Sequence, residues 1–191
     1  MKGTYVFLAD GFEVSEALTT VNMLRRGGVN VKTVSIYDDR IVTSSNRIPV
    51  VADMAFGEFR ASTTFGPCLP TDVMIFPGGM PGSANLAAFG KLMDIMQDHY
   101  AQGGTVAAIC AAPALVLAKH GILNQNIPAT GYPGTEQYLP QAKSDNVVID
   151  EAHNIITSRG PATAIDFALA ILTHLTDRKT ANKVAQDMLV I

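Results

Sequence analysis

The chain has 191 residues, of which 48% are hydrophobic and 16% are charged, and its formal net charge is −3. This composition excludes an intrinsically disordered chain, and the length fits one domain, residues 1–191, that needs no disulfide or metal for stability. Lys and Arg do not cluster, and no apolar run approaches the ~18–20 residues of a membrane span, so we expect neither nucleic-acid nor membrane binding.

The N-terminal residues predict a strand rather than a targeting segment. One basic residue is followed by a short apolar run that ends at Asp10, whereas a signal peptide needs a longer apolar core. We therefore expect a cytoplasmic protein, in which Cys68 and Cys110 are free thiols. The four histidines show no metal-ligand spacing, so we predict no metal and no other cofactor.

The first part of the chain has the pattern of a β–α–β unit. Residues 4–9 are β-prone, apolar residues at helical spacing then continue to Gly27-Gly28, and residues 29–37 alternate as a second strand. Asp10 and Glu13 have the spacing of a capping box at the start of the helix. The order predicts parallel strands joined by a right-handed crossover.

The same alternation continues to the C-terminus. We expect a small hairpin (41–43 and 48–52), a loop (63–70), buried strands (73–76 and 104–110), helices (84–100 and 111–120), a late hairpin (146–150 and 154–157), a helix opened by 158–161 with Pro161 as its first residue, and a final helix (179–189). The pattern predicts an α/β fold, a three-layer α/β/α sandwich around a mostly parallel sheet.

Cys110 is the strongest candidate for chemistry. It follows an apolar strand and precedes the small residues Ala111-Ala112-Pro113-Ala114, as a nucleophile on a tight strand-to-helix turn does. The start of the following helix favours a thiolate, so we predict a lowered pKa, and the N–H of Ala111 is placed to bind an oxyanion. The alternative is a buried, inert cysteine.

Two further positions accompany Cys110 at the carboxyl ends of the predicted strands, where ligands bind in such sheets. Gly78 and Gly79 follow a strand and let backbone N–H groups approach a ligand, although an ordinary turn explains them equally. Glu16 shares a helix stripe with Thr20 and Met23 that faces a cleft or a partner subunit; the alternative is plain solvent exposure.

Four segments together resemble the ThiJ/PfpI family, in family order and over nearly the whole chain. They are Ala9-Asp10-Gly11-Phe12-Glu13 with Glu16, Phe76-Pro77-Gly78-Gly79, Ala108-Ile109-Cys110-Ala111-Ala112-Pro113, and Thr157-Ser158-Arg159-Gly160-Pro161. The resemblance implies a flavodoxin-like fold related to class I glutamine amidotransferase domains, and a homodimer.

The resemblance also implies roles for individual residues. Cys110 would be the reactive, easily oxidised cysteine, Glu16 the acid at its sulfur, and the N–H groups of Gly79 and Ala111 the oxyanion donors, with Gly78 shaping the loop. Arg159 and Tyr132 would lie beside the site. Tyr132 takes the place of a histidine found in the deglycase-like branch, and Ala111 replaces the histidine that follows the cysteine in protease-like members, so no Cys–His pair is expected.

Three functions remain open at this stage. The first is a cofactor-independent glyoxalase III- or deglycase-like enzyme acting on a small reactive carbonyl substrate, with Cys110 as nucleophile and Glu16 as acid/base. The second is a non-enzymatic redox sensor or stress chaperone that uses oxidation of Cys110. The third, an amidohydrolase or protease, lacks a histidine next to the nucleophile in the sequence.

Overall fold

The computed structural model describes residues 1–191 and has one central six-stranded sheet. The strand order is β2-β1-β5-β6-β10-β9; every neighbouring pair is parallel except β10 with the edge strand β9. These strands are β1 (Thr4–Leu8), β2 (Val31–Ser35), β5 (Val73–Phe76), β6 (Thr105–Ile109), β9 (Val147–Asp150) and β10 (Ile155–Ser158).

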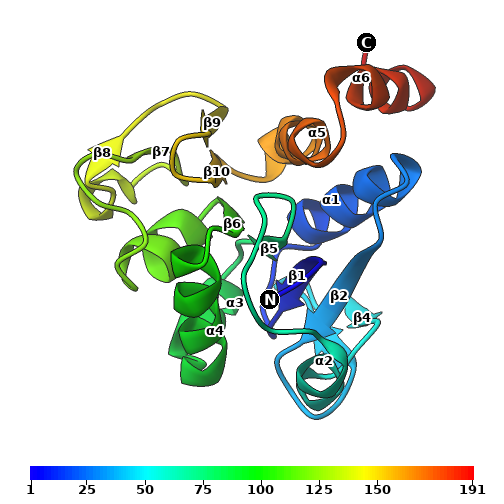
Figure 1. Ribbon diagram of the computed structural model, residues 1–191, viewed down its shortest axis with the longest axis vertical. Coiled ribbons are helices and arrows are strands. Elements are labelled where there is room, and N and C mark those ends of the chain that lie inside the picture. The colour runs from blue at the N-terminus through cyan, green and yellow to red at the C-terminus, as the bar shows by residue number, and fades with distance from the viewer.

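Helices cover both faces of this sheet, as Figure 1 shows. One face packs against α1 (Val14–Arg26), α5 (Ala164–Leu175) and α6 (Arg178–Asp187), and the other against α2 (Phe56–Ser62), α3 (Gly82–Ala88), α4 (Gly90–Ala101) and the π-helix η1 (Pro113–Ala118). The predicted three-layer α/β/α sandwich with a mostly parallel sheet is confirmed.

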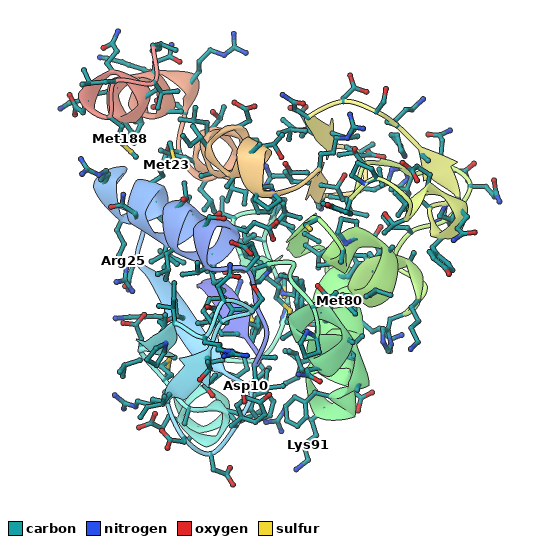
Figure 2. The ribbon with its side chains drawn as sticks, turned by 180° about the vertical axis from the view of Figure 1, so that it is seen from behind. Asp10, Met23, Arg25, Met80, Lys91 and Met188 are labelled. Carbon is teal, nitrogen blue, oxygen red and sulfur yellow. The ribbon has the colours of Figure 1, made fainter.

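Strand β1 shows why the sheet needs cover on both sides. Phe7 belongs to the core under α2, α3 and α4, whereas Val6 and Leu8 belong to the core under α1 and α5, and all three are fully buried. Alternate side chains of a strand point to opposite faces, so a strand that is apolar throughout has both faces covered. On the α1 face, Met23 and Met188 lie between α1 and α6 (Figure 2).

Several small elements complete the fold. The predicted hairpin is present as β3 (Ile41–Thr43) and β4 (Pro49–Val51), and the late hairpin is β9 with β10. The elements that the sequence pattern did not predict are helix α2, the two-residue strands β7 (Pro128–Ala129) and β8 (Gln141–Ala142), and the 3₁₀ turn η2 (Glu136–Tyr138). None of the helices is long and apolar enough to span a bilayer.

Three local predictions were wrong. The helix expected over 84–100 is two helices, because Phe89 leaves the helical conformation between α3 and α4. The capping box of Asp10 and Glu13 does not form: Glu13 is itself the N-cap of α1, and Asp10 accepts the N–H of Thr43 instead. Pro161 opens a 3₁₀ turn, η3 (Pro161–Thr163), and α5 begins only after it.

The helix stripe of α1 that was predicted to face a cleft or a partner subunit does not form a free surface. Glu16, Thr20 and Met23 are all buried within the chain itself. Thr20 donates its hydroxyl to the main-chain carbonyl of Glu16 at 2.7 Å, which satisfies a polar group inside the helix packing. The stripe is therefore no evidence for a partner subunit at this position, and the predicted homodimer would have to use other residues.

Candidate active site

Cys110 occupies the turn that follows β6, and its backbone conformation is unusual. Its φ of 66° lies in the left-handed region, which costs energy for a residue with a side chain. The turn is held from both sides, because the N–H of Cys110 donates to the carbonyl of Ser158 at 2.9 Å and its carbonyl accepts the N–H of Tyr132 at 2.7 Å. The predicted strained turn is confirmed, although the helix that follows is the π-helix η1.

Glu16 lies beside Cys110 and not in solvent. It is the third residue of α1, its side chain is 1% exposed, and its Oε2 accepts the N–H of Gly78 at 2.7 Å. A Cβ built on Gly78 would lie 2.6 Å from that Oε2 and 3.0 Å from the Cys110 sulfur. The carboxyl group and the thiol thus lie against the same glycine, and only a residue without a side chain fits between them.

The loop after β5 brings backbone donors to the sulfur. The backbone N–H groups of Gly79 and Ala111 lie near Cys110 Sγ, and both act to lower the pKa of its thiol. Gly79 has a φ of 89°, and a Cβ there would lie 2.4 Å from the N of Glu13 and 2.5 Å from the carbonyl of Gly11. A glycine is therefore required at position 79, and the close approach of the two loops fixes where its N–H points.

The charge state of this pair is set by burial. Burial raises the pKa of the Glu16 carboxyl to about 7, because the low-dielectric interior disfavours the carboxylate more strongly than the Gly78 N–H stabilises it. The second oxygen, Oε1, is buried without a hydrogen-bond partner, which disfavours ionisation further. Glu16 consequently holds a proton in part of the molecules near neutral pH.

The sequence-based prediction of a lowered Cys110 pKa is not supported. Burial and an ionised Glu16 raise the pKa of Cys110 to about 12, against the lowering effect of the Gly79 and Ala111 N–H groups. A neutral Glu16 removes the repulsion between the two charges, so the two groups share their protons as a coupled pair. A thiol that is activated by proton transfer to Glu16 fits this site better than a permanent thiolate.

A small pocket of about 280 Å³ opens over the sulfur. Its lining residues come from six segments of the chain: Glu13, Ser45, Gly79, Met80, Cys110, Ala111, Tyr132 and Pro161. Met80, labelled in Figure 2, is 57% exposed at the turn between β5 and α3. A larger hollow of about 850 Å³ lies over Arg40 and Glu58, but no cysteine, serine or threonine lines it, so chemistry favours the smaller pocket.

The two residues predicted to lie beside the site differ in their placement. Tyr132 lines the pocket, is half-exposed, and has its ring against Gly160. Arg159 does not line it: the guanidinium donates to the carbonyl of Ser144 at 3.1 Å, away from the sulfur. Arg159 therefore supports the loop before β9 rather than the pocket.

No histidine lines the pocket around Cys110. The four histidine rings are bound elsewhere, to the carbonyls of Thr105, Ala87 and Pro70 and to the carboxylate of Asp150. The site therefore lacks a Cys–His pair in space as well as in sequence, and Glu16 is the ionisable group next to the sulfur.

Glu13 and Ser45 line the pocket although the sequence did not identify them. One Glu13 oxygen caps α1 by accepting the N–H of Ser15, and the other accepts the Ser45 hydroxyl at 3.3 Å. Glu13 looked like a capping residue only, and its second role depends on the hairpin loop folding back. Ser45 carries no local signal, because only the tertiary fold brings this loop to the pocket.

Comparison with known proteins decides the family. The sequence model of the DJ-1/PfpI protein family matches residues 2–174 of this chain. The chain belongs to the DJ-1/PfpI family. Protein dj-1beta of Drosophila melanogaster is 34% identical over 191 residues, which cover 99% of this chain and 97% of that protein. The glutathione-independent glyoxalase DJR-1.2 of Caenorhabditis elegans is 30% identical, covering 92% and 89%.

Solved structures of the DJ-1/PfpI family agree with this fold. Oxidized Toxoplasma gondii DJ-1 matches with a TM-score of 0.89 and 34% identity, over 99% of this chain and 98% of that one. Drosophila melanogaster DJ-1beta matches with a TM-score of 0.87 and 32% identity, over 100% and 98%. The expected flavodoxin-like fold is thereby confirmed.

Proposed function

We propose that this protein is a cofactor-independent glyoxalase that converts small 2-oxoaldehydes such as methylglyoxal into 2-hydroxy acids. The observation that carries the proposal is the contact of the Glu16 carboxyl group and the Cys110 sulfur with the same face of Gly78. A nucleophile and an acid/base group at one point are what an internal transfer of hydrogen between adjacent carbons requires. The glyoxalase activity named for the Caenorhabditis elegans relative supports the same substrate class.

The reaction begins with an attack of the Cys110 sulfur on the aldehyde carbon. An S–C bond forms, the carbonyl π electrons move to oxygen, and the thiol proton passes to Glu16 or to that oxygen, which gives a hemithioacetal. The N–H groups of Gly79 and Ala111, which point at the sulfur, lie where they can also bind the new oxygen.

Glu16 then moves a proton between the two carbons of the substrate. It removes the proton from the former aldehyde carbon to give an enediol, and returns a proton to the neighbouring carbon, which leaves a thioester on Cys110. Water cleaves the thioester, releases lactate and restores the thiol. The aldehyde is oxidised and the ketone reduced within one molecule, so no external oxidant is needed. A carboxyl group with a pKa of about 7 suits both steps near neutral pH.

The size of the pocket supports a small substrate. A volume of about 280 Å³ is at the lower end for a ligand site, and the half-exposed Tyr132 and Met80 border its opening. A free 2-oxoaldehyde of a few carbons fits such a space, whereas the pocket offers no extended groove for a polypeptide. We therefore favour glyoxalase over deglycase activity on proteins.

Lactate formation from methylglyoxal tests the proposal. We expect activity in the wild type and in Cys68→Ser, which removes the other thiol, and none above background in Cys110→Ser. Glu16→Gln keeps the shape of the side chain and loses the acid/base group, so we expect a fall of about 10²–10⁴-fold in kcat. Full activity in Cys110→Ser would eliminate the enzyme mechanism.

A redox-sensing role for Cys110 is the second candidate. The N–H groups around its sulfur could bind the oxygens of a sulfinate, and the Toxoplasma gondii relative is described in an oxidized form. A wild-type protein that forms no lactate but changes its thermal stability or binding after graded peroxide treatment would favour this role over catalysis.

A further inference from the structure

One acidic side chain and no basic side chain lines the pocket over the Cys110 sulfur. Glu13 is the acidic residue, and the lining residues include no Lys, Arg or His. Arg47 and Arg159 are each two residues from a lining residue in the sequence, yet neither lines the pocket. The guanidinium of Arg159 donates to the carbonyl of Ser144 instead. A negative charge on a bound molecule therefore meets no cation of this chain in the pocket wall.

Main-chain contacts fix Glu13 beside the loop that follows β5. The N–H of Glu13 donates to the carbonyl of Gly78 at 2.9 Å. The loop between β3 and β4 is tied to the same segment, because the N–H of Ser45 donates to the carbonyl of Phe12 at 2.9 Å. The entry to α1 and the β3–β4 loop thus form this part of the pocket wall together, and the backbone of Glu13 has a fixed position in it.

Three donors hold the Glu13 carboxylate at this wall. Oε1 accepts the N–H of Ser15 at 3.2 Å and the Ser15 hydroxyl at 2.7 Å, and Oε2 accepts the Ser45 hydroxyl at 3.3 Å. Hydrogen bonds donated to a carboxyl group favour its charged form. Glu13 is only partly exposed, so water and salt screen its charge less than the charge of a free surface residue.

The charge of Glu13 acts on the groups next to the sulfur. Burial is the main cause that raises the pKa of the Glu16 carboxyl to about 7, and the negative charge of Glu13 adds to this rise. Glu13 therefore already disfavours a second negative charge within the site. A substrate or product that carries a carboxylate or a phosphate group meets the same repulsion.

We propose that Glu13 restricts the Cys110 pocket to uncharged aldehydes and promotes release of the acid that forms there. The inference rests on the glyoxalase function proposed above, and it narrows the substrate class to neutral 2-oxoaldehydes, to the exclusion of aldehydes that carry a carboxylate or a phosphate group. Methylglyoxal is neutral, whereas lactate is an anion at neutral pH. Because like charges brought together in a binding site are disfavoured, Glu13 repels the product and not the substrate. Glu13 is thus a specificity-determining residue that takes no part in bond making.

Alkylation of Cys110 by two reagents of different charge tests this role without any substrate. Iodoacetamide is neutral and iodoacetate is an anion, while the reacting carbon and the leaving iodide are the same. Each reagent forms an S–C bond with the thiolate and releases iodide. The ratio of the two rate constants is therefore independent of the thiolate fraction, which Glu13 also influences through Glu16. Peptide mass spectrometry follows Cys110 separately from Cys68, and a neutral cysteine amide in solution gives the reference ratio.

Three variants change the charge or the shape of a side chain at position 13 or at a remote position. We expect the wild type to prefer iodoacetamide by about 5–10-fold more than the reference thiol does, the effect of one like charge at roughly 7 Å and a dielectric constant of about 40. Glu13→Gln should lose this preference, whereas Glu13→Asp, which keeps the charge and a good capping oxygen, should keep most of it. Glu151→Gln is the matched control. Glu151 is exposed in the turn that precedes β10, at the other end of the sheet from Cys110, and its loss changes the net charge of −3 by the same one unit.

The other outcomes would overturn the proposal. An unchanged preference in Glu13→Gln would show that its charge does not act at the sulfur, and an equal fall in Glu151→Gln would assign the effect to the net charge of the protein. Loss of the preference in Glu13→Asp as well as in Glu13→Gln would assign it to the cap of α1. Added NaCl should reduce the preference of the wild type, and a preference that is independent of salt would contradict an electrostatic cause.

The alkylation ratio also separates this inference from the proposed function, because it does not depend on lactate formation. A protein that discriminates between the two reagents but forms no lactate from methylglyoxal would refute the glyoxalase proposal alone. A protein that forms lactate but does not discriminate would refute the role of Glu13 alone.

Discussion

The substitution Gly78→Ala tests whether contact between Glu16 and Cys110 is what makes the site work. Gly78 is buried and its φ is not in the left-handed region, so the backbone tolerates alanine. The added Cβ, however, would lie 2.5 Å from the Cys110 Cβ and 2.6 Å from Glu16 Oε2, whereas ordinary contacts are 3.4–4 Å. The Cys110 and Glu16 side chains must therefore both move by about 1 Å relative to position 78.

The expected effect on activity is larger than the effect on stability. A misplacement of about 1 Å in a catalytic group costs around 100-fold in rate. Overpacking at a buried position costs about 1–3 kcal/mol of unfolding free energy, which leaves the protein folded. We therefore expect Gly78→Ala to lose about 100-fold in kcat/KM for methylglyoxal, with a melting temperature lower by only several degrees.

Gly57→Ala is the matched control for this experiment. Gly57 lies inside α2, nothing surrounds its Cβ position within 4 Å, and its φ is also not left-handed. Alanine there should stabilise the helix by up to about 1 kcal/mol and leave activity unchanged. Lactate formation and thermal unfolding of both variants give the comparison. Activity of Gly78→Ala within about threefold of Gly57→Ala would refute the reasoning that the two groups act together across Gly78.

Three further predictions concern pH, oxidation and assembly. Because the pKa of Glu16 is raised from 4.5 to about 7, its contribution to the free energy of unfolding is complete below pH 4.5 and is lost as the pH rises through about 7. Urea unfolding of the wild type should therefore show a fall of up to about 3 kcal/mol in unfolding free energy over this range, and Glu16→Gln should not show it. Equal pH profiles of the two proteins would contradict this prediction. Cys68 lies beside His99 at the start of β6 and Cys110 follows the end of that strand, so peroxide should oxidise Cys110 without joining it to Cys68, and a peptide linking the two thiols would contradict the structure. We expect a homodimer that covers the exposed Ile41, Ile48 and Val51 of the β3–β4 hairpin; light scattering that gives a 20.3 kDa species at micromolar concentration would exclude it.

The sequence predicted the layers of the fold because its strands are apolar on both faces and alternate with amphipathic helices. It also identified Cys110, Gly78 and Gly79, since a nucleophile turn and a close backbone approach need small residues at fixed positions beside a strand end. These are local constraints, and the residues that satisfy them are adjacent in the chain. Helix α2 was not predicted because its seven residues are too few to show a helical period.

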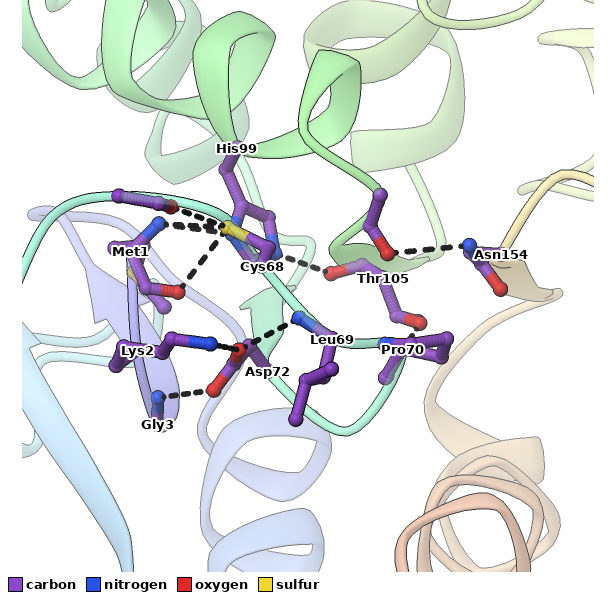
Figure 3. Close-up of polar contacts among 12 residues, drawn as sticks. Met1, Lys2, Gly3, Cys68, Leu69, Pro70, Asp72, His99, Thr105 and Asn154 are labelled. Atoms are coloured by element: carbon purple, nitrogen blue, oxygen red, sulfur yellow. Dashed lines mark hydrogen bonds and ion pairs between the residues drawn. The ribbon is translucent and has the colours of Figure 1, made fainter.

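Tertiary structure decided which groups meet. Helical periodicity left Glu16 open between a cleft and solvent, and only the packing of α1 against the loop after β5 buries it at the Cys110 sulfur. The same packing overturned the low thiol pKa expected from the helix start, because desolvation and a neighbouring carboxyl group act through space. Cys68 and His99 are 31 residues apart and carry no shared sequence pattern, yet Cys68 Sγ lies 3.3 Å from His99 Nδ1 (Figure 3). Their meeting depends on the order of strands in the sheet, which no local rule of spacing encodes.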